Sequence, residues 1–298
     1  MSGTGEIHGI YPMLYTYFDA EGGLDQTAIR DEVDACVANG AHGIAVGGLA
    51  SETNKLSTEE RRTLMEAAAE ALAGRLPLSV TIAESSIEGQ ISMTKAAAAA
   101  GAAWVVLQPP PVKGASEAEL IRFYGAVADA APLPVGIQNA PEYIGIGVSN
   151  AGFAELNRRH PNVKVLKAEG PATYIAGLAE ATGGVYRLFN GRDGIDLVDS
   201  LHAGCHGMIP GVETVDVQSR IYELVRAGED AAAEREFREI LPLLSYLMQS
   251  IDHLLCYGKR LAARRIGLGD VYDRTPAEAP TAFGLEILER WSKHLAVF

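Results

Sequence analysis

Val163-Lys164-Val165-Leu166-Lys167-Ala168-Glu169-Gly170 reads as a short strand that ends in a lysine, an acid and a glycine, with Pro171 opening a helix. Alternate residues of a strand share a face, so Val163, Val165 and Lys167 are expected to point the same way. In a parallel barrel Lys167 would stand at the carboxyl end of its strand, where barrel enzymes carry their chemistry. The octet predicts a reactive lysine, with a surface lysine near a strand end as the alternative.

An amine in this position has one evident use, which is attack on a ketone to form a Schiff base. The amine must first lose its proton, and an apolar barrel interior favours the neutral form. Glu169 has the same strand parity as Lys167 and would oppose that effect if it also pointed inward. The hypothesis therefore requires that Glu169 is turned away from Lys167 or paired elsewhere.

Short apolar segments alternate with helix-like segments along the chain, at spacings of roughly 25 to 35 residues. This alternation predicts a parallel sheet, and eight such units fit a closed (β/α)8 TIM barrel. An open doubly wound sheet is the alternative, but no Gly-x-Gly-x-x-Gly supports nucleotide binding after the first strand. Besides the lysine strand, the expected strands are Ile7–Tyr15, His42–Val46, Leu78–Ile82, Trp104–Gln108, Pro134–Asn139, Val185–Asn190 and Gly207–Ile209.

Helix signals fall between these strands and continue after the last of them. Ser57 with Glu60 and Ser116 with Glu119 have the spacing of capping boxes, and one barrel helix is expected over Gly194–Ala203. The segments Val215–Arg226, Asp230–Gln249, His253–Ile266 and Pro280–Ala296 are helix-like with no strand between them. We expect a barrel over residues 1–226 and a C-terminal helical appendage over 227–298 that packs on it.

Composition narrows the class of protein. The chain has 298 residues, with 25 basic against 38 acidic side chains and a formal charge of −13, which argues against nucleic acid or an anionic membrane as a partner. Three scattered cysteines give no disulfide framework. Met1–Gly9 lacks the features of a signal peptide, and no apolar run reaches the ~18 residues of a membrane helix. We expect a cytoplasmic protein with a small-molecule partner.

Two further clusters carry candidate chemistry. His202–His206 contains metal-capable side chains, but Gly204 is expected to end a helix there, so neither a metal nor a cofactor is predicted. Lys259–Arg260 and Arg264–Arg265 form a basic patch that we expect to be a solvated or subunit-contact face.

Three stretches taken together, Gly48–Glu52, Ile137–Pro141 and Val165–Glu169, resemble the dihydrodipicolinate synthase / N-acetylneuraminate lyase family of class I aldolases and lyases. The likeness covers essentially the whole chain, including Gly207–Gly211 with Ile209. It implies that Lys167 forms a Schiff base with pyruvate or another 2-oxo acid. It also implies that the loop Gly48, Leu49, Ala50 and Ser51 binds the substrate carboxylate through backbone N–H groups. Ile209 would line the substrate site, and homotetramers or dimers would be usual.

The sequence departs from the family pattern at several of these positions. Leu49 and Ala50 replace two hydroxyl residues of the loop, and Ser51 replaces its second glycine. Gln138 replaces a tyrosine that relays protons, and an amide cannot exchange a proton at neutral pH, although Gln138 can still orient a substrate. The family arginine that grips the aldehyde substrate falls at Tyr143, so lysine biosynthesis is not the expected role.

Other matches favour the dehydratases and related lyases of 2-keto-3-deoxy sugar acids. These matches are Lys55–Leu56, Glu169–Gly170, Pro210–Gly211 and Arg274–Pro276. In that chemistry an imine acidifies C3, so that a hydroxyl leaves C4 or the C3–C4 bond breaks. A water, the substrate's own groups, Tyr15 or Tyr143 could then move the proton. Arg192, next to Asp193 after strand seven, could bind a second carboxylate or a sugar-acid hydroxyl.

The sequence therefore predicts a Schiff-base lyase, an aldolase or a dehydratase, acting on a 2-oxo acid. Lys167 would be the nucleophile and Gln138 would orient the substrate. The loss of the tyrosine and of the loop hydroxyls motivates an alternative, a catalytically silent relative that binds a 2-oxo acid or serves as a regulatory or structural subunit. A deaminase of a cyclic imine acid is a further alternative.

Overall fold

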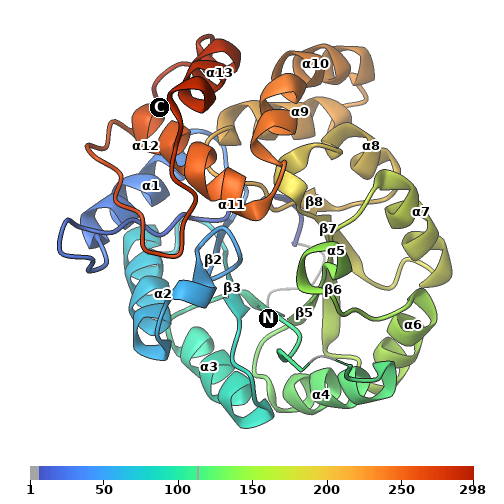
Figure 1. The fold of residues 1–298 in the computed structure, drawn as a ribbon. Helices are drawn as coiled ribbons and strands as arrows, with labels where there is room; N and C mark the ends of the chain where they lie inside the picture. Colours follow the sequence, from blue (N-terminus) through green and yellow to red (C-terminus); the bar gives the residue numbers. More distant parts are fainter. Residues whose placement is uncertain (1–6, 113) are drawn as a thin grey trace.

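The computed structural model describes residues 7–112 and 114–298, so most of the Met1–Gly9 segment lies outside the described residues. Eight parallel strands form one sheet in the order β1-β8-β7-β6-β5-β4-β3-β2. A parallel bridge between Met13 and Ala45 joins the segment after β1 to β2, so the sheet curls round on itself in a TIM-barrel-like fold (Figure 1). The strands are β1 (Gly9–Ile10), β2 (Ile44–Val46), β3 (Leu78–Ile82), β4 (Trp104–Leu107), β5 (Val135–Asn139), β6 (Val163–Ala168), β7 (Arg187–Asn190) and β8 (Gly207–Met208).

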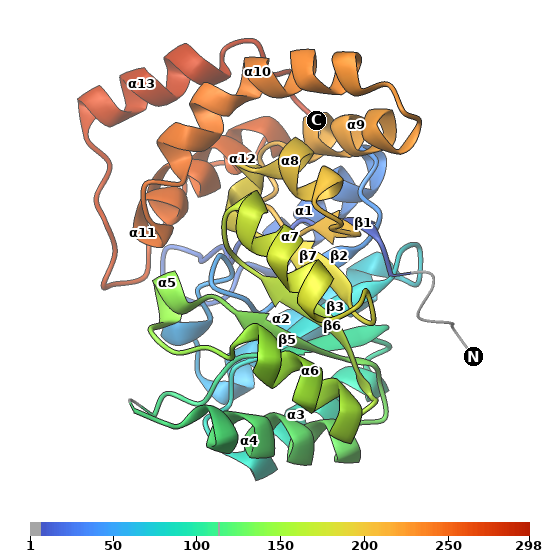
Figure 2. The ribbon, with the colours of Figure 1, turned by 90° about the vertical axis from the view of Figure 1, so that its right-hand side faces the viewer.

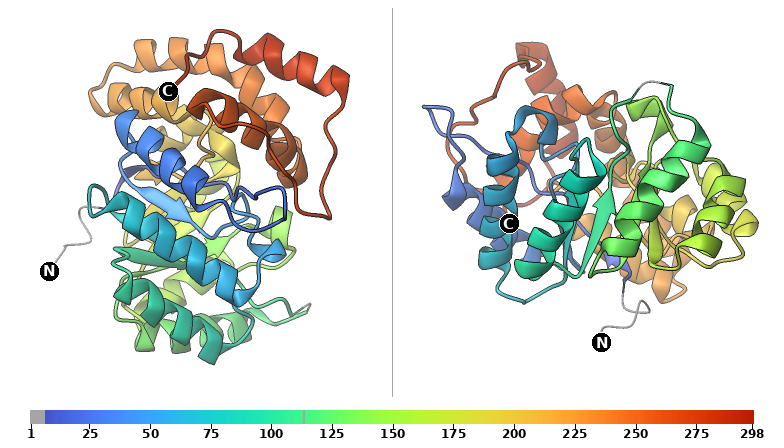
Figure 3. Two further views of the ribbon diagram at one scale, coloured as in Figure 1. Left: turned by 90° about the vertical axis from the view of Figure 1, so that its left-hand side faces the viewer. Right: turned by 90° about the horizontal axis from the view of Figure 1, so that it is seen from below.

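Helices cover the outside of the sheet in the views of Figure 3. The predicted capping boxes are present at Ser57 and Ser116, where each serine accepts from the N3 backbone and each N3 glutamate bonds back. The predicted alternation of strands and helices is thus confirmed. The helices are α1 (Gln26–Ala38), α2 (Thr58–Leu72), α3 (Ile87–Ala99), α4 (Glu117–Ala130), α6 (Asn150–Arg159), α7 (Ala172–Ala181), α8 (Leu197–His202) and α9 (Val215–Arg226).

Three elements differ from expectation. The first strand is only two residues long, Gly9–Ile10, although Tyr11 N still donates to Met208 O at 2.9 Å and Met13 N to Pro210 O at 2.7 Å. Pro12 lies on the side that faces β2, where it has no N–H to donate, and Leu14 N then donates to Ala45 O at 2.9 Å. The helix expected over Gly194–Ala203 is a 3-10 turn, η3 (Arg192–Gly194), followed by α8. A short helix α5 (Pro141–Ile144), with proline at its first position, was not predicted.

The barrel interior is filled by aromatic side chains below the lysine strand's carboxyl end. Tyr11, Trp104 and Phe189 are fully buried, with ring centroids 5.5 to 5.6 Å apart. Phe189 of β7 is in register with Lys167 of β6. A packed floor of this kind leaves Lys167 with apolar surroundings beneath it and an opening only toward the carboxyl ends of the strands.

The C-terminal region contains α10 (Asp230–Leu247), α11 (Ile251–His253), a π-helix η4 (Leu254–Gly258), α12 (Lys259–Ile266) and α13 (Ala282–Ser292). Figure 2 shows α11 and α5 at the same end of the barrel and α10 with α13 beyond α8. The division at residue 227 stays a prediction. The expected solvated basic face is wrong for Lys259 and Arg265, which are 0% and 2% exposed.

The helices of residues 7–112 and 114–298 are all too short or too polar to cross a membrane.

Candidate active site

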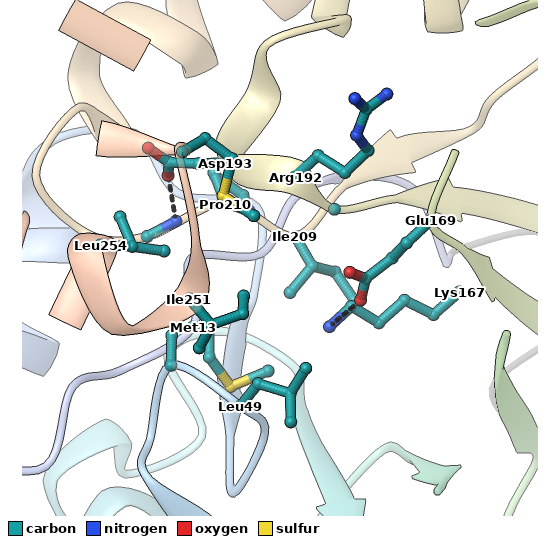
Figure 4. A pocket seen from close by; sticks show the side chains of 14 residues that line it. Met13, Leu49, Lys167, Glu169, Arg192, Asp193, Ile209, Pro210, Ile251 and Leu254 are labelled. Carbon is teal, nitrogen blue, oxygen red and sulfur yellow. Dashed lines mark hydrogen bonds and ion pairs between the residues drawn. The ribbon is translucent and has the colours of Figure 1, made fainter. Parts of the chain in front are cut away.

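Lys167 lies near the carboxyl end of β6 and is 5% exposed. Its side chain borders a pocket that encloses about 360 Å³ of empty space, open solvent at the mouth included (Figure 4). The cavity itself measures about 30 Å³, so a bound organic acid would extend into the open mouth. The pocket is lined by Met13, Leu49, Ala50, Lys167, Glu169, Gly191, Arg192, Asp193, Ile209, Pro210, Gly211, Met248, Ile251 and Leu254.

Glu169 points into this pocket and pairs with Lys167, so it is neither turned away from the lysine nor paired only elsewhere, as the hypothesis required. Its Oε1 lies 2.9 Å from Lys167 Nζ, and the side chain is only 4% exposed. The strand pairing continues one residue past β6, because Glu169 N donates to Asn139 O at 2.9 Å, and the inward parity continues with it. The ion pair places a proton acceptor against the amine.

Gln138 completes this group from the neighbouring strand. It is in register with Lys167 across the β5–β6 pair, and its Nε2 donates to Glu169 Oε1 at 2.9 Å. Its Oε1 is buried and has no hydrogen-bond partner among the described residues. Gln138 does not line the pocket itself, and its hydrogen bond holds Glu169, which does.

The loop after β2 carries the predicted carboxylate site. Ser51 Oγ accepts from Gly47 N and donates to Leu14 O, so the serine hydroxyl is used to brace the loop. Gly48 N faces Met13 Sδ at 3.3 Å. Within the described chain, the N–H groups of Leu49 and Ala50 have no acceptor, and both residues line the pocket. Two free backbone donors at a pocket wall suit a carboxylate.

A buried charge network anchors the same loop. Glu52 has a left-handed backbone, with φ of 54°, and is 4% exposed. Its Oε1 accepts from Lys259 Nζ at 2.8 Å, and its Oε2 accepts from Lys55 Nζ at 2.7 Å. The Lys259 ammonium also lies 4.9 Å from the centroid of the Phe18 ring. Burial lowers the pKa of Lys259, and the Glu52 carboxylate opposes that shift.

Arg192 lines the pocket from the other side, but its guanidinium is engaged. Its Nη1 donates to Asp196 Oδ2 at 2.6 Å, and Figure 4 shows the group directed away from Lys167. Tyr143 of α5 does not line the pocket; burial raises the pKa of its phenol, and the nearby Arg192 guanidinium opposes that shift. Ile209, after β8, lines the pocket as expected from the sequence.

Asp193 joins a buried acid cluster at the far wall. Its Oδ1 accepts from Gly211 N at 2.8 Å, and Glu213 Oε2 accepts from Tyr15 Oη at 2.8 Å. Asp193 Oδ2 and Glu213 Oε1 have no other partner in the described chain. Burial, and then the neighbouring Glu213 carboxyl, raises the pKa of Asp193, and burial also raises the pKa of Glu213. The pair therefore holds a proton to higher pH than exposed carboxyls do.

This retained proton makes stability depend on pH. Because the folded-state pKa of each acid exceeds its unfolded value near 4, the stability it contributes is full below about pH 4 and is lost as the pH rises through the folded pKa. We expect the Asp193→Asn variant, which keeps an acceptor for Gly211 N, to lose less unfolding free energy between pH 5 and pH 9 than the parent. Denaturant unfolding across that range measures it, and parallel curves for the two proteins would contradict the retained proton.

Sequence reasoning missed the side chains that the C-terminal region contributes to the pocket. Met248, Ile251 and Leu254 line it from the end of α10 through α11 to the first residue of the π-helix. A π-turn shifts the register of the side chains that follow by one position, and such turns are frequent at functional sites. Nothing in the local sequence marks these residues as neighbours of Lys167.

Comparisons with known proteins relate nearly the whole chain to one family. Residues 6–279 match the model of the dihydrodipicolinate synthetase family. An L-2-keto-3-deoxyarabonate dehydratase of Azospirillum brasilense is 30% identical over 82% of this chain and 81% of its own length. A 4-hydroxy-tetrahydrodipicolinate synthase of Stenotrophomonas maltophilia (strain K279a) is 31% identical over 88% of each chain.

The fold is also similar to that of solved structures of this family. The solved 4-hydroxy-tetrahydrodipicolinate synthase of Methylacidiphilum fumariolicum SolV superposes with a TM-score of 0.89 at 24% identity, covering 96% of this chain and 95% of that one. The predicted family resemblance is confirmed, and relatives of this similarity are lyases. The chain belongs to the dihydrodipicolinate synthetase family.

Proposed function

We propose that this protein is a Schiff-base lyase that acts on a 2-oxo acid, with Lys167 as the nucleophile. The observation that carries the proposal is the position of Lys167. It is a buried amine at the carboxyl end of a barrel strand, facing a pocket that is open to solvent, with a carboxylate 2.9 Å away. The unpaired N–H groups of Leu49 and Ala50 would bind the carboxylate of the same substrate.

Glu169 would take the proton that Lys167 must lose. The amine then attacks the C2 carbonyl, and water leaves as the imine forms. For dehydration, loss of a C3 proton gives an enamine and the C4 hydroxyl departs as water. For aldol cleavage, the C4 hydroxyl loses its proton, the C3–C4 bond breaks, an aldehyde leaves and C3 is reprotonated. Hydrolysis of the imine frees Lys167 in both cases.

In this mechanism Glu169 relays the proton. It is not among the candidates that the sequence suggests for this role. Tyr15 is occupied by Glu213, and burial raises the pKa of its phenol well above the ordinary value. Tyr143 lies outside the pocket lining. Gln138 would keep Glu169 pointed at the amine through its amide N–H, which is a positioning role.

Replacing Glu169 by glutamine is expected to lower kcat by about 10²- to 10⁴-fold, the usual contribution of a general acid–base group. The loss should exceed any change in KM, and the acidic limb of the pH–rate profile should change. Steady-state kinetics of the parent, the Glu169→Gln variant and a Glu142→Gln control, whose carboxylate is exposed on α5, measure this. A kcat within twofold of the parent in the Glu169→Gln variant would exclude the relay.

The products of turnover distinguish the remaining possibilities. A panel of 2-keto-3-deoxy acids and a cyclic imine acid is offered, and the release of pyruvate, of a dehydrated 2,5-dioxo acid or of ammonia is followed. Pyruvate identifies cleavage, the dioxo acid identifies dehydration, and ammonia identifies the deaminase. Imine formation without any of the three would favour the catalytically silent relative.

The family resemblance also supports a homo-oligomer, a tetramer or a dimer, in a cytoplasmic setting. Light scattering of the purified protein at micromolar concentration would give the subunit number.

A further inference from the structure

The pocket wall beyond Lys167 is apolar. Leu49 of the loop and Met13 face Ile251 across the space toward which the Lys167 ammonium points (Figure 4). Met248 and Leu254 extend that wall, and Leu254 is 4% exposed. A chain attached to C3 of a bound 2-oxo acid would therefore extend from the imine toward hydrocarbon side chains. The C-terminal region supplies most of these side chains.

The cations that line the same pocket are each engaged by an acid of the chain. Among the described residues that line the pocket the cations are Lys167 and Arg192. Lys167 is committed to Glu169 and then to the imine. Arg192 Nη1 is paired with Asp196 Oδ2 at 2.6 Å, while Arg192 Nε is buried and has no hydrogen-bond partner in the described part of the chain. Asp193 adds an acid to the lining. A distal carboxylate would thus have to compete with Asp196 for the charge of Arg192.

We infer that the substrate part beyond the C4 hydroxyl is uncharged and apolar, and that Leu49, Ile251 and Leu254 select it. The natural substrate is then a 2-oxo acid with an aliphatic or aromatic extension, and the departing fragment in a cleavage reaction is an apolar aldehyde. This inference rests on the proposed function, since it takes the 2-oxo acid to be held at Lys167. The inference goes beyond the proposed function because it excludes diacids as substrates and assigns substrate specificity to the C-terminal region.

Hydride trapping of the imine with matched 2-oxo acids tests the inference without requiring turnover. 2-Oxohexanoate and 2-oxoadipate have the same six-carbon chain and differ in a terminal methyl or carboxylate, and pyruvate has no extension. The concentration that gives half-maximal trapping by borohydride, read as adduct mass on the intact protein, is measured for each. We expect it to be at least about tenfold lower for 2-oxohexanoate than for 2-oxoadipate, because the terminal carboxylate of 2-oxoadipate must compete with Asp196 for Arg192 and is otherwise buried against hydrocarbon.

An introduced cation should reverse the preference. Ile251 is partly exposed at the start of α11, so Ile251→Arg is expected to fold and to bring the half-saturating 2-oxoadipate concentration down by about tenfold or more. Leu285→Arg, at a site on α13 that is 41% exposed, is the matched control and should leave both values unchanged.

The outcomes separate the two proposals. If the parent protein traps pyruvate, and its half-saturating concentration for 2-oxoadipate is equal to or lower than that for 2-oxohexanoate, the apolar selection is overturned. The Schiff-base function would still stand. An effect of Leu285→Arg equal to that of Ile251→Arg would also overturn it, because the cation would then act without touching the wall. Failure to trap pyruvate at all would overturn the proposed function itself.

Discussion

Replacing Lys167 by arginine is expected to lower kcat/KM by about 10⁴-fold or more, as removal of a covalent nucleophile does in other enzymes. A guanidinium keeps the positive charge beside Glu169 but does not add to a ketone at neutral pH. The buried ion pair with Glu169 can therefore persist while imine formation stops. Steady-state kinetics with the best substrate of the 2-keto-3-deoxy acid panel measure the loss.

Lys164→Arg is the matched control for this substitution. Lys164 lies on the same strand with the opposite parity and is partly exposed, so its replacement should leave kcat/KM within about twofold of the parent. Residual turnover above one hundredth of the parent rate in the Lys167→Arg variant would assign the chemistry to another group.

Replacing Lys259 by methionine is expected to lower the free energy of unfolding by about 3–5 kcal/mol, since it removes one partner of a buried charge pair. Lys259 is 0% exposed, and Glu52 is nearly as buried. Methionine keeps the packing of the aliphatic stem against Phe18 but leaves a carboxylate oxygen of Glu52 without its donor. The loop that carries the Leu49 and Ala50 N–H groups should loosen at the same time.

Equilibrium urea unfolding of the parent and the variant gives the change in stability. Lys55→Met is the control, since Lys55 bonds the other oxygen of Glu52 but is more exposed, and it should cost only about 1 kcal/mol. A loss below 1 kcal/mol in Lys259→Met would show that the pair contributes little to holding the loop.

Local sequence patterns were sufficient to place the lysine. The β-branched run at Val163 and Val165 and the glycine after Glu169 predict a strand, and strand parity sends Lys167 to the side on which the barrel interior lies. The capping boxes at Ser57 and Ser116 fix two helix starts by short-range hydrogen bonds, which a sequence shows directly. These features depend on neighbours fewer than about five residues apart.

The surroundings of the lysine depend on contacts between distant residues and could not be read in this way. Glu169 points inward because it continues the ladder with Asn139, and Lys259 is buried because Glu52 lies across from it. Strand parity alone does not decide whether Glu169 still belongs to the strand, and the sequence pattern makes Lys259 look like a surface charge. Ile251 and Leu254 reach the pocket only through the packing of the C-terminal helices, for which the chain carries no local signal.

The departures from the family pattern form one consistent change. Where a tyrosine would relay protons, Gln138 instead fixes Glu169 against Lys167. Where two hydroxyl residues would line the loop, Leu49 and Ala50 keep their backbone donors and make the wall apolar. In the proposed mechanism the proton relay belongs to a carboxylate, and the substrate site is less polar.

Borohydride reduction in the presence of pyruvate, followed by intact-protein mass and peptide mapping, tests the central claim most directly. The account predicts one reduced pyruvyl adduct per chain, on Lys167, and none in the Lys167→Arg variant. No adduct with pyruvate or with longer 2-oxo acids, or an adduct on another lysine that persists in that variant, would contradict it.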